Sequence, residues 1–138
     1  MKINSESEML AFGEKFAKKL LYKGDPSVIE LIGDVGTGKT TFTRGLARGL
    51  GVKEPITSPS FTISKSYALK NGGRLIHYDF YRLNDPGIMQ DDLAENLKDN
   101  KNIIVIEWGE SIKSLLPKKH TTIEISYDDT EGRIVSIL

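Results

Sequence analysis

The segment 33–40 constrains the fold of this chain more than any other. It reads Gly-Asp-Val-Gly-Thr-Gly-Lys-Thr and matches the phosphate-binding pattern G-x-x-x-x-G-K-[ST]. An apolar run at 28–32 precedes it, and a helical pattern at 41–50 follows it. A strand, a glycine-rich turn and a helix N-terminus form the context in which this motif binds phosphate. The sequence therefore predicts an α/β domain with a phosphate site at this turn.

The residue types of the motif suit that chemistry. Glycines let the backbone curl so that its N–H groups can surround a phosphate, and the following helix adds its own unpaired N–H groups. Lys39 can carry a positive charge to the β- and γ-phosphates of a nucleotide, and the hydroxyl of Thr40 can bind Mg²⁺. An ordinary glycine-rich turn between a strand and a helix is the weaker interpretation.

Length and composition limit the remaining possibilities. The 138 residues are expected to form a single domain, 1–138, and 19 basic residues balance 19 acidic ones. This balance disfavours a chain that binds nucleic acid alone through a basic face. The chain has no cysteine, no signal-peptide pattern and no apolar run near the ~20 residues that span a bilayer. We therefore expect a cytoplasmic protein without a membrane partner.

Two predicted strands end in a carboxylate. Asp79 follows the apolar part of the segment 74–80, and Glu107 follows the strongly apolar run 103–106, which we expect to be a buried strand of a parallel sheet. Ligands of open α/β sheets bind beyond the carboxyl ends of the strands, where P-loop proteins place an acidic residue for the metal. His77 is interpreted as a structural histidine of its strand, while Trp108 either belongs to the core or shields the site.

Other patterns complete the expected fold. A helix is expected from Ser5 to Lys23, with Ser5 and Glu8 forming a capping box, and another helix is expected to open at Asp85-Pro86. The Pro- and Ser-rich segment 53–61 is either a plain loop or a loop that orders around a γ-phosphate. The remaining expected elements are a hairpin of strands 61–69 and 74–80 joined through Asn71-Gly72-Gly73, a short helical turn before Pro117, and closing strands at 121–126 and 133–138.

The order of four motifs resembles one family. These motifs are GDVGTGKTTFTRGLARGLG from Gly33, SPSFT at 58–62, HYDFYRL at 77–83 followed by DP, and IEW at 106–108. In this order they resemble the bacterial TsaE family of tRNA threonylcarbamoyladenosine biosynthesis ATPases, over about residues 13–132.

The resemblance implies a fold, an activity and partners. The fold would be a compact P-loop α/β domain whose mostly parallel sheet is flanked by helices and includes an antiparallel hairpin. The activity would be Mg²⁺-dependent ATP binding and hydrolysis, slow in the isolated protein. The partners would be TsaB and TsaD, which transfer the threonylcarbamoyl group to the adenosine beside the anticodon. The chain would meet tRNA only through that complex and would not transfer the group itself.

The resemblance also assigns roles to residues of this chain. Lys39, Asp79 and Glu107 would be catalytic, with Asp79 orienting or deprotonating the attacking water. Thr40 and Glu107 would bind Mg²⁺, and residues 58–62 would form a switch loop. The nucleotide would be bound by Asp34, Val35, Gly36, Thr37, Gly38, Lys39, Thr40, Thr41 and Arg133.

Two positions depart from the family pattern. Position 60 is Ser where the family usually has Thr, which keeps a hydroxyl in the switch loop. Met9 stands where the family usually has Thr, so a contact of that Thr with the nucleotide would be missing here or supplied by Ser5 or Ser7.

Three other functions remain open at this point. A small-molecule kinase would need an acceptor pocket and an arginine-rich lid, and the sequence between Asp79 and Glu107 has no such insertion. A GTPase would need the base-reading Asp of N-K-x-D, and position 103 is Ile. A nucleotide-gated scaffold would bind ATP without depending on hydrolysis, and the chain has no obvious arginine finger that would argue against it.

Overall fold

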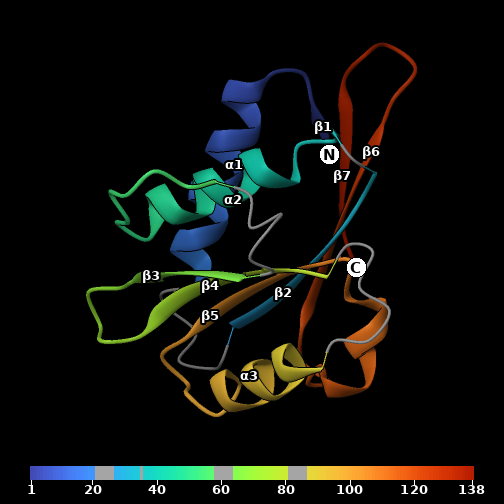
Figure 1. Ribbon diagram of the computed structural model, residues 1–138. Helices are drawn as coiled ribbons and strands as arrows, with labels where there is room; N and C mark the ends of the chain where they lie inside the picture. Colours follow the sequence, from blue (N-terminus) through green and yellow to red (C-terminus); the bar gives the residue numbers. More distant parts are fainter. Residues whose placement is uncertain (21–26, 35, 58–63, 81–86) are drawn as a thin grey trace.

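The computed structural model describes residues 1–20, 27–34, 36–57, 64–80 and 87–138 (Figure 1). These residues form one α/β domain built on a seven-stranded sheet. The strands are β1 (Lys2–Ile3), β2 (Ser27–Ile32), β3 (Ser64–Ala68), β4 (Arg74–Asp79), β5 (Ile103–Glu107), β6 (Thr121–Tyr127) and β7 (Arg133–Ile137). The helices are α1 (Glu6–Leu20), α2 (Lys39–Gly49) and α3 (Ile88–Asn96), with a 3₁₀ segment η1 at Gly109–Leu115.

The sheet has the order β1-β7-β6-β2-β5-β4-β3. Its centre is parallel, because β2 pairs in parallel with β5 and β6, and β4 pairs in parallel with β5. Antiparallel pairs lie toward both edges: β3 with β4, β6 with β7, and β1 with β7. β5 is buried along its whole length, as expected for a central parallel strand covered on both faces.

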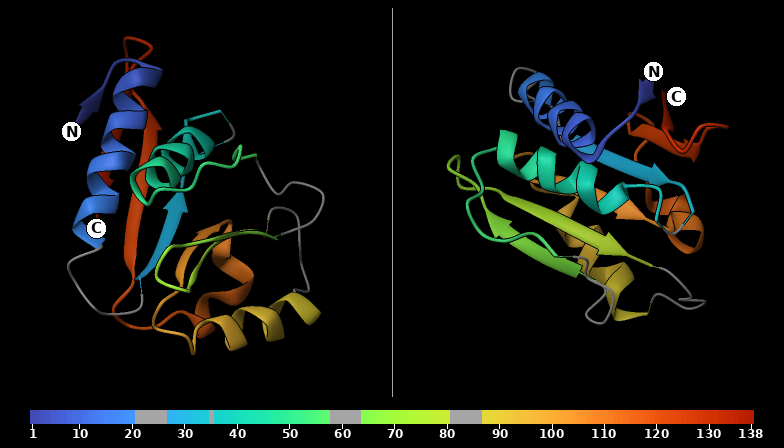
Figure 2. Two further views of the ribbon diagram at one scale, coloured as in Figure 1. Left: turned by 90° about the vertical axis from the view of Figure 1, so that its left-hand side faces the viewer. Right: turned by 90° about the horizontal axis from the view of Figure 1, so that it is seen from above.

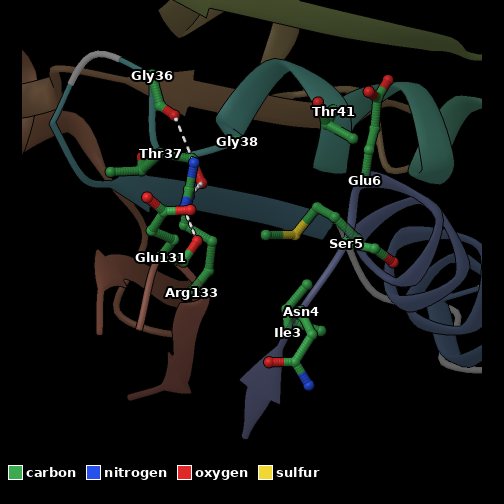
Figure 3. A pocket seen from close by; sticks show the side chains of 11 residues that line it. Ile3, Asn4, Ser5, Glu6, Gly36, Thr37, Gly38, Thr41, Glu131 and Arg133 are labelled. Atoms are coloured by element: carbon green, nitrogen blue, oxygen red, sulfur yellow. Dashed lines mark hydrogen bonds between the residues drawn. The ribbon is translucent and has the colours of Figure 1, made fainter. Parts of the chain in front are cut away.

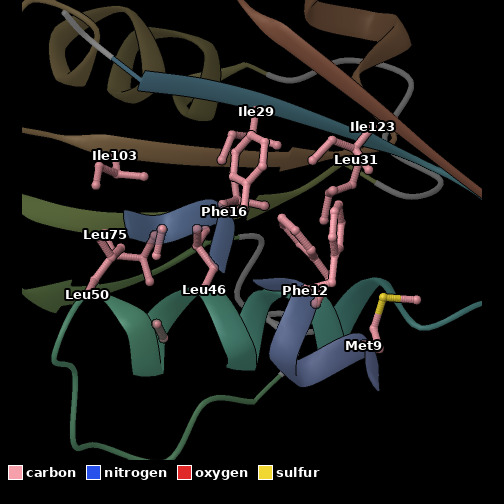
Figure 4. Close-up of a cluster of buried hydrophobic side chains, with 14 of the residues drawn as sticks. Met9, Phe12, Phe16, Ile29, Leu31, Leu46, Leu50, Leu75, Ile103 and Ile123 are labelled. Atoms are coloured by element: carbon pink, nitrogen blue, oxygen red, sulfur yellow. The ribbon is translucent and has the colours of Figure 1, made fainter. Parts of the chain in front are cut away.

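Helices cover both faces of the sheet (Figure 2). On one face α1 and α2 lie over a cluster that includes Phe12, Phe16 and Phe42, whose rings contact one another (Figure 4). On the other face α3 and η1 cover a second cluster around Tyr78 and Phe80. The two clusters follow from strand alternation, which sends successive side chains to opposite faces.

Glycines bring α1 and α2 into close contact. A Cβ on Gly13 would lie 2.5 Å from the carbonyl oxygen of Phe42, and a Cβ on Gly45 would lie 2.2 Å from that of Leu10. Neither neighbour is a flexible side chain, so neither could move aside at little cost. The two helices therefore pack backbone against backbone.

Most predicted elements are present, and their boundaries differ locally. Half of the predicted capping box forms: the N–H of Glu8 donates to Ser5 Oγ at 3.1 Å, but the Glu8 carboxylate accepts from the N–H of Asn4 instead of that of Ser5. Within the described residues α1 ends at Leu20, and 21–26 lie outside them. The helix predicted to open at Asp85-Pro86 begins at Ile88 after Gly87, and that dipeptide also lies outside the described residues. The Asn-Gly-Gly hairpin and both closing strands form as predicted.

No helix among the described residues has the length and apolar character needed to cross a bilayer.

The close contact of α1 with α2 predicts the effect of one substitution. We expect Gly45→Ala to lower the free energy of unfolding by about 1–3 kcal/mol, because the added Cβ overpacks the interface. This loss should exceed the gain of about 1 kcal/mol that alanine brings to a helix interior. Urea unfolding would measure the change, with Lys19→Ala on the exposed side of α1 as the control. A Gly45→Ala protein as stable as the wild type would contradict the close packing.

Candidate functional site

The glycine-rich turn connects β2 to α2 in a conformation that favours glycine. Gly36 has a φ of 86° and Gly38 a φ of 111°, both in the left-handed region that side chains disfavour. Gly33 lies against β6, where a Cβ would come within 2.5 Å of the Ile125 carbonyl oxygen. α2 begins at Lys39 directly after Gly38, and no side chain caps it. Its first N–H groups therefore lack partners within the helix and are available to an anion.

A cavity of about 310 Å³ adjoins this helix terminus (Figure 3). One wall is the turn and the start of α2, with Gly36, Thr37, Gly38 and Thr41. The other walls come from distant parts of the sequence: Ile3, Asn4, Ser5, Glu6 and Met9 near the start of α1, and Glu131 and Arg133 at the start of β7. Its volume falls within the range of about 300–1,000 Å³ typical of small-molecule sites.

Lys39 is the most enclosed cation of this region. Its side chain is 7% exposed, and its ammonium contacts the carbonyl oxygen of Gly33. Lys39 Nζ also lies 3.8 Å from Glu107 Oε1 and 4.4 Å from the centre of the Trp108 ring. Trp108 thus contacts this lysine on one side and packs against the α3-side core on the other, so both roles considered from the sequence apply.

Glu107 ends β5 and is buried, with its side chain 5% exposed. Its second oxygen, Oε2, contacts Nε2 of His77, a fully buried residue of the neighbouring strand β4. Glu107 is therefore enclosed by an ammonium on one oxygen and an imidazole on the other. A buried carboxylate needs such partners.

Of the other predicted site residues, Asp79 lies beside Glu107 in the sheet, whereas Thr40 and Asp34 belong to the glycine-rich turn and the helix that follows it. Asp79 ends β4 and is the register partner of Glu107, so both side chains leave the sheet on the same face. Asp79 is half-buried. Thr40 is half-buried in the first turn of α2, and Asp34 is exposed at the start of the glycine-rich turn.

Arg133 lies against the glycine-rich turn, although 96 residues separate it from Thr37. Its Nε donates to the Thr37 carbonyl oxygen at 3.0 Å, and its guanidinium stacks over the Tyr127 ring at 4.3 Å. A weaker contact joins its Nη2 to the Gly36 carbonyl oxygen at 3.4 Å. Arg133 thus supports the turn through backbone carbonyls while lining the cavity.

Asp128 orders the β6–β7 hairpin that carries Arg133. Its Oδ1 accepts from the N–H groups of Thr130 at 2.8 Å and Gly132 at 2.7 Å. Lys2 Nζ lies 3.4 Å from Asp128 Oδ2. The N–H of Thr130 holds the pKa of the Asp128 carboxyl below its ordinary value of 3.8, with Gly132 and Lys2 acting in the same direction against some desolvation.

Some sequence predictions lie outside the described residues. These are Val35, the proposed switch loop at 58–62, and residues 81–83 of the HYDFYRL motif. The departure at position 9 is described: Met9 lines the cavity, and so does Ser5, whereas Ser7 is exposed and does not belong to its lining.

Two contributions were missed from the sequence. The cavity wall of Asn4, Glu6 and Glu131 depends on chain segments that meet only after folding. The contact of His77 with Glu107 was missed as well, because His77 was treated as part of its strand alone. Strand alternation offered a signal for it, since His77 lies two residues before Asp79 and therefore on the same face as that carboxylate.

The residues of the site suit a nucleotide and a divalent cation. The positive φ angles of Gly36 and Gly38 give the turn a backbone conformation that side chains disfavour, and the uncapped helix terminus after it suits phosphate. The carboxylate of Glu107 and the hydroxyl of Thr40 are oxygen ligands of the type Mg²⁺ prefers. The described residues hold no cluster of three or more His, Cys, Asp or Glu side chains, so a cation here would need oxygens from elsewhere, such as phosphates.

Comparison with known proteins gives a consistent result. Residues 3–135 match the family described as "Threonylcarbamoyl adenosine biosynthesis protein TsaE". A Haemophilus influenzae protein named tRNA threonylcarbamoyladenosine biosynthesis protein TsaE is 36% identical over 134 residues, which are 96% of this chain and 84% of that protein. The protein of the same name from Bacillus subtilis is 40% identical over 112 residues, 79% of this chain and 67% of that protein.

The fold also has a solved counterpart. The crystal structure of Bacillus subtilis YdiB superimposes with a TM-score of 0.78 at 30% sequence identity. The match covers 99% of this chain and 82% of that one.

The lowered pKa of Asp128 predicts a stability difference that depends on pH. Because the folded protein favours the ionised carboxyl, its contribution is present above the ordinary pKa of 3.8 and is lost as the pH falls through the lower folded value. Asp128→Asn should therefore unfold at a lower temperature than the wild type at pH 6, and the difference should shrink below pH 4. Thermal unfolding monitored by circular dichroism from pH 6 to 3 would test this, with Asp129→Asn as the control. Parallel profiles for Asp128→Asn and the wild type would contradict it.

Proposed function

The chain belongs to the TsaE family of tRNA threonylcarbamoyladenosine biosynthesis proteins, and we propose on this premise that it is a Mg²⁺-dependent ATPase of that pathway. Its reaction would be slow in the isolated protein. It would act with a TsaB–TsaD complex that modifies the adenosine beside the anticodon of tRNA, without transferring the threonylcarbamoyl group itself.

One observation carries this proposal. The uncapped N-terminus of α2 faces the cavity, and Lys39, its first residue, is buried beside Glu107 at 3.8 Å. An unpaired helix terminus, a lysine and a carboxylate at a strand end are the three parts that P-loop proteins combine to bind a nucleotide with its metal ion. The cavity beside the turn offers space for the base and ribose.

The residues of the chain take distinct roles in this proposal. The N–H groups of Gly36–Thr41 bind the phosphates, and Lys39 exchanges its contact with Glu107 for one with the β- and γ-phosphates. Thr40 and Glu107 would hold Mg²⁺, which when bound neutralises charge on the phosphates. Asp79 orients the attacking water, since it lies beside Glu107 on the same face of the sheet. Arg133 keeps the turn in place through its bonds to Thr37 and Gly36.

Lys39→Ala tests nucleotide binding. The variant should lose tight ATP binding in the presence of Mg²⁺, because it lacks the charge that meets the β- and γ-phosphates. Titration calorimetry would measure the dissociation constant, with Lys19→Ala on the exposed side of α1 as the control. Lys39 also lies beside the buried carboxylate of Glu107, which the substitution would leave without its cation. A thermal unfolding scan must therefore first show that the variant is folded. Unchanged ATP affinity in a folded variant would contradict the proposal.

Asp79→Ala separates binding from hydrolysis. We expect ATP affinity to stay near the wild-type value and turnover to fall about 10²–10⁴-fold, as for the loss of a general base. Phosphate release would be measured for the protein alone and mixed with TsaB and TsaD, with Asp91→Ala on the exposed face of α3 as the control. Turnover should be low alone and higher in the mixture. A variant that loses turnover but still supports tRNA modification would instead favour a nucleotide-gated scaffold.

A further inference from the structure

The chain contains two histidines, and each meets a buried glutamate of the sheet. His77 contacts Glu107 on the face covered by α1 and α2. His120 lies 3.6 Å from Glu30, whose register partner Ile106 belongs to the core on the opposite face. The structure therefore holds two similar pairs, of which one adjoins the glycine-rich turn and the other lies across the sheet from it.

The two imidazoles differ in which ring nitrogen carries the proton. Nδ1 of His120 lies 2.7 Å from the Pro117 carbonyl oxygen, which can only accept, so Nδ1 carries a proton. Nδ1 of His77 is buried and has no hydrogen-bond partner in the described part of the chain. A buried N–H without an acceptor is costly. The proton of His77 therefore belongs on Nε2, which donates to Glu107 Oε2.

This bond leaves the two oxygens of Glu107 with different surroundings. Oε2 is taken up by the imidazole, while Oε1 faces Lys39 and the glycine-rich turn. Because the His77 side chain is fully buried on the face covered by α1 and α2, close packing restrains its ring from turning away from the carboxylate. The rotation of Glu107 about its side-chain bonds is restrained by the same contact.

We propose that His77 is a positioning residue: its Nε2–H holds Oε2 of Glu107 so that Oε1 points to the cation site beside the phosphates. This inference rests on the proposed function, since it concerns the carboxylate that would bind Mg²⁺. Carboxylate ligands of metals are commonly held by such outer hydrogen bonds, whose loss lowers metal affinity about 10–100-fold. The Glu30–His120 pair lies on the opposite face of the sheet and is expected to have no such effect.

Metal binding gives the first test. Mn²⁺ affinity would be measured by electron paramagnetic resonance on the protein saturated with ADP, and ADP affinity would be measured separately in EDTA. His77→Leu should lower Mn²⁺ affinity about 10–100-fold and leave ADP affinity in EDTA unchanged. His77→Gln, whose amide can donate from nearly the same place as Nε2, should recover most of the loss. His120→Leu is the matched control and should match the wild type.

The outcomes separate this inference from the proposal on which it rests. Equal Mn²⁺ affinity in folded His77→Leu and wild type would overturn the positioning role. An equal loss in His77→Leu and His120→Leu would also overturn it, because the effect would then come from general destabilisation. A wild type that binds neither ADP nor Mn²⁺–ADP would contradict the proposed function instead.

A second measurement needs no variant of His77 and no nucleotide. In the ¹⁵N-labelled wild type, the protonated and bare nitrogens of a neutral imidazole resonate far apart, and the His120→Leu spectrum assigns the remaining histidine to His77. We expect a proton on Nε2 and a bare Nδ1 for His77. A proton on Nδ1 with a bare Nε2 would overturn the inference, because Nε2 could then not donate to Glu107.

Discussion

The arrangement of the site depends on a buried cation. Lys39 is almost completely enclosed, which is tolerable only because a carbonyl, a carboxylate and the face of an aromatic ring surround its ammonium. These partners come from the end of β2 and the end of β5, so one side chain joins the helix that follows the glycine-rich turn to the two central strands. Moving the lysine toward a phosphate would leave Glu107 in need of a replacement charge. A divalent cation would supply this positive charge. Binding of the phosphate by Lys39 and binding of the cation by Glu107 would then favour each other.

The elements that carry this arrangement could be predicted from local patterns. The glycine spacing, the apolar run 103–106 and the Asn-Gly-Gly turn each act over fewer than a dozen residues, and each forms the expected structure. The prediction that Asp79 and Glu107 each end a strand also holds, and the structure shows that these strands are parallel neighbours with their carboxyl ends at one edge. The start of α3 was predicted less accurately. Asp-Pro is a good start signal on its own, yet α3 begins later, at Ile88.

Local sequence patterns could not predict the contacts between neighbouring strands or between residues far apart in the sequence. Arg133 was linked to the nucleotide by family resemblance alone, and its bonds to the carbonyls of the turn depend on the hairpin that Asp128 orders. The role of His77 depends on the register between β4 and β5. A shift by one residue would place it on the opposite face, so a strand pattern alone cannot assign its partner.

The backbone contact between α1 and α2 has a mechanical consequence for the cavity. Glu6 and Met9 of α1 form one wall, and Gly38 and Thr41 at the start of α2 form the facing wall. Because the backbones of the two helices touch at Gly13 and Gly45, close packing holds these two walls together. The third wall, with Arg133, is attached to them by side-chain hydrogen bonds to the turn and by the pairing of β7 with β1, in which Arg133 and Ile3 are register partners. The walls of the cavity are therefore joined by helix packing, strand pairing and hydrogen bonds, so a ligand would enter a site that the fold has already assembled.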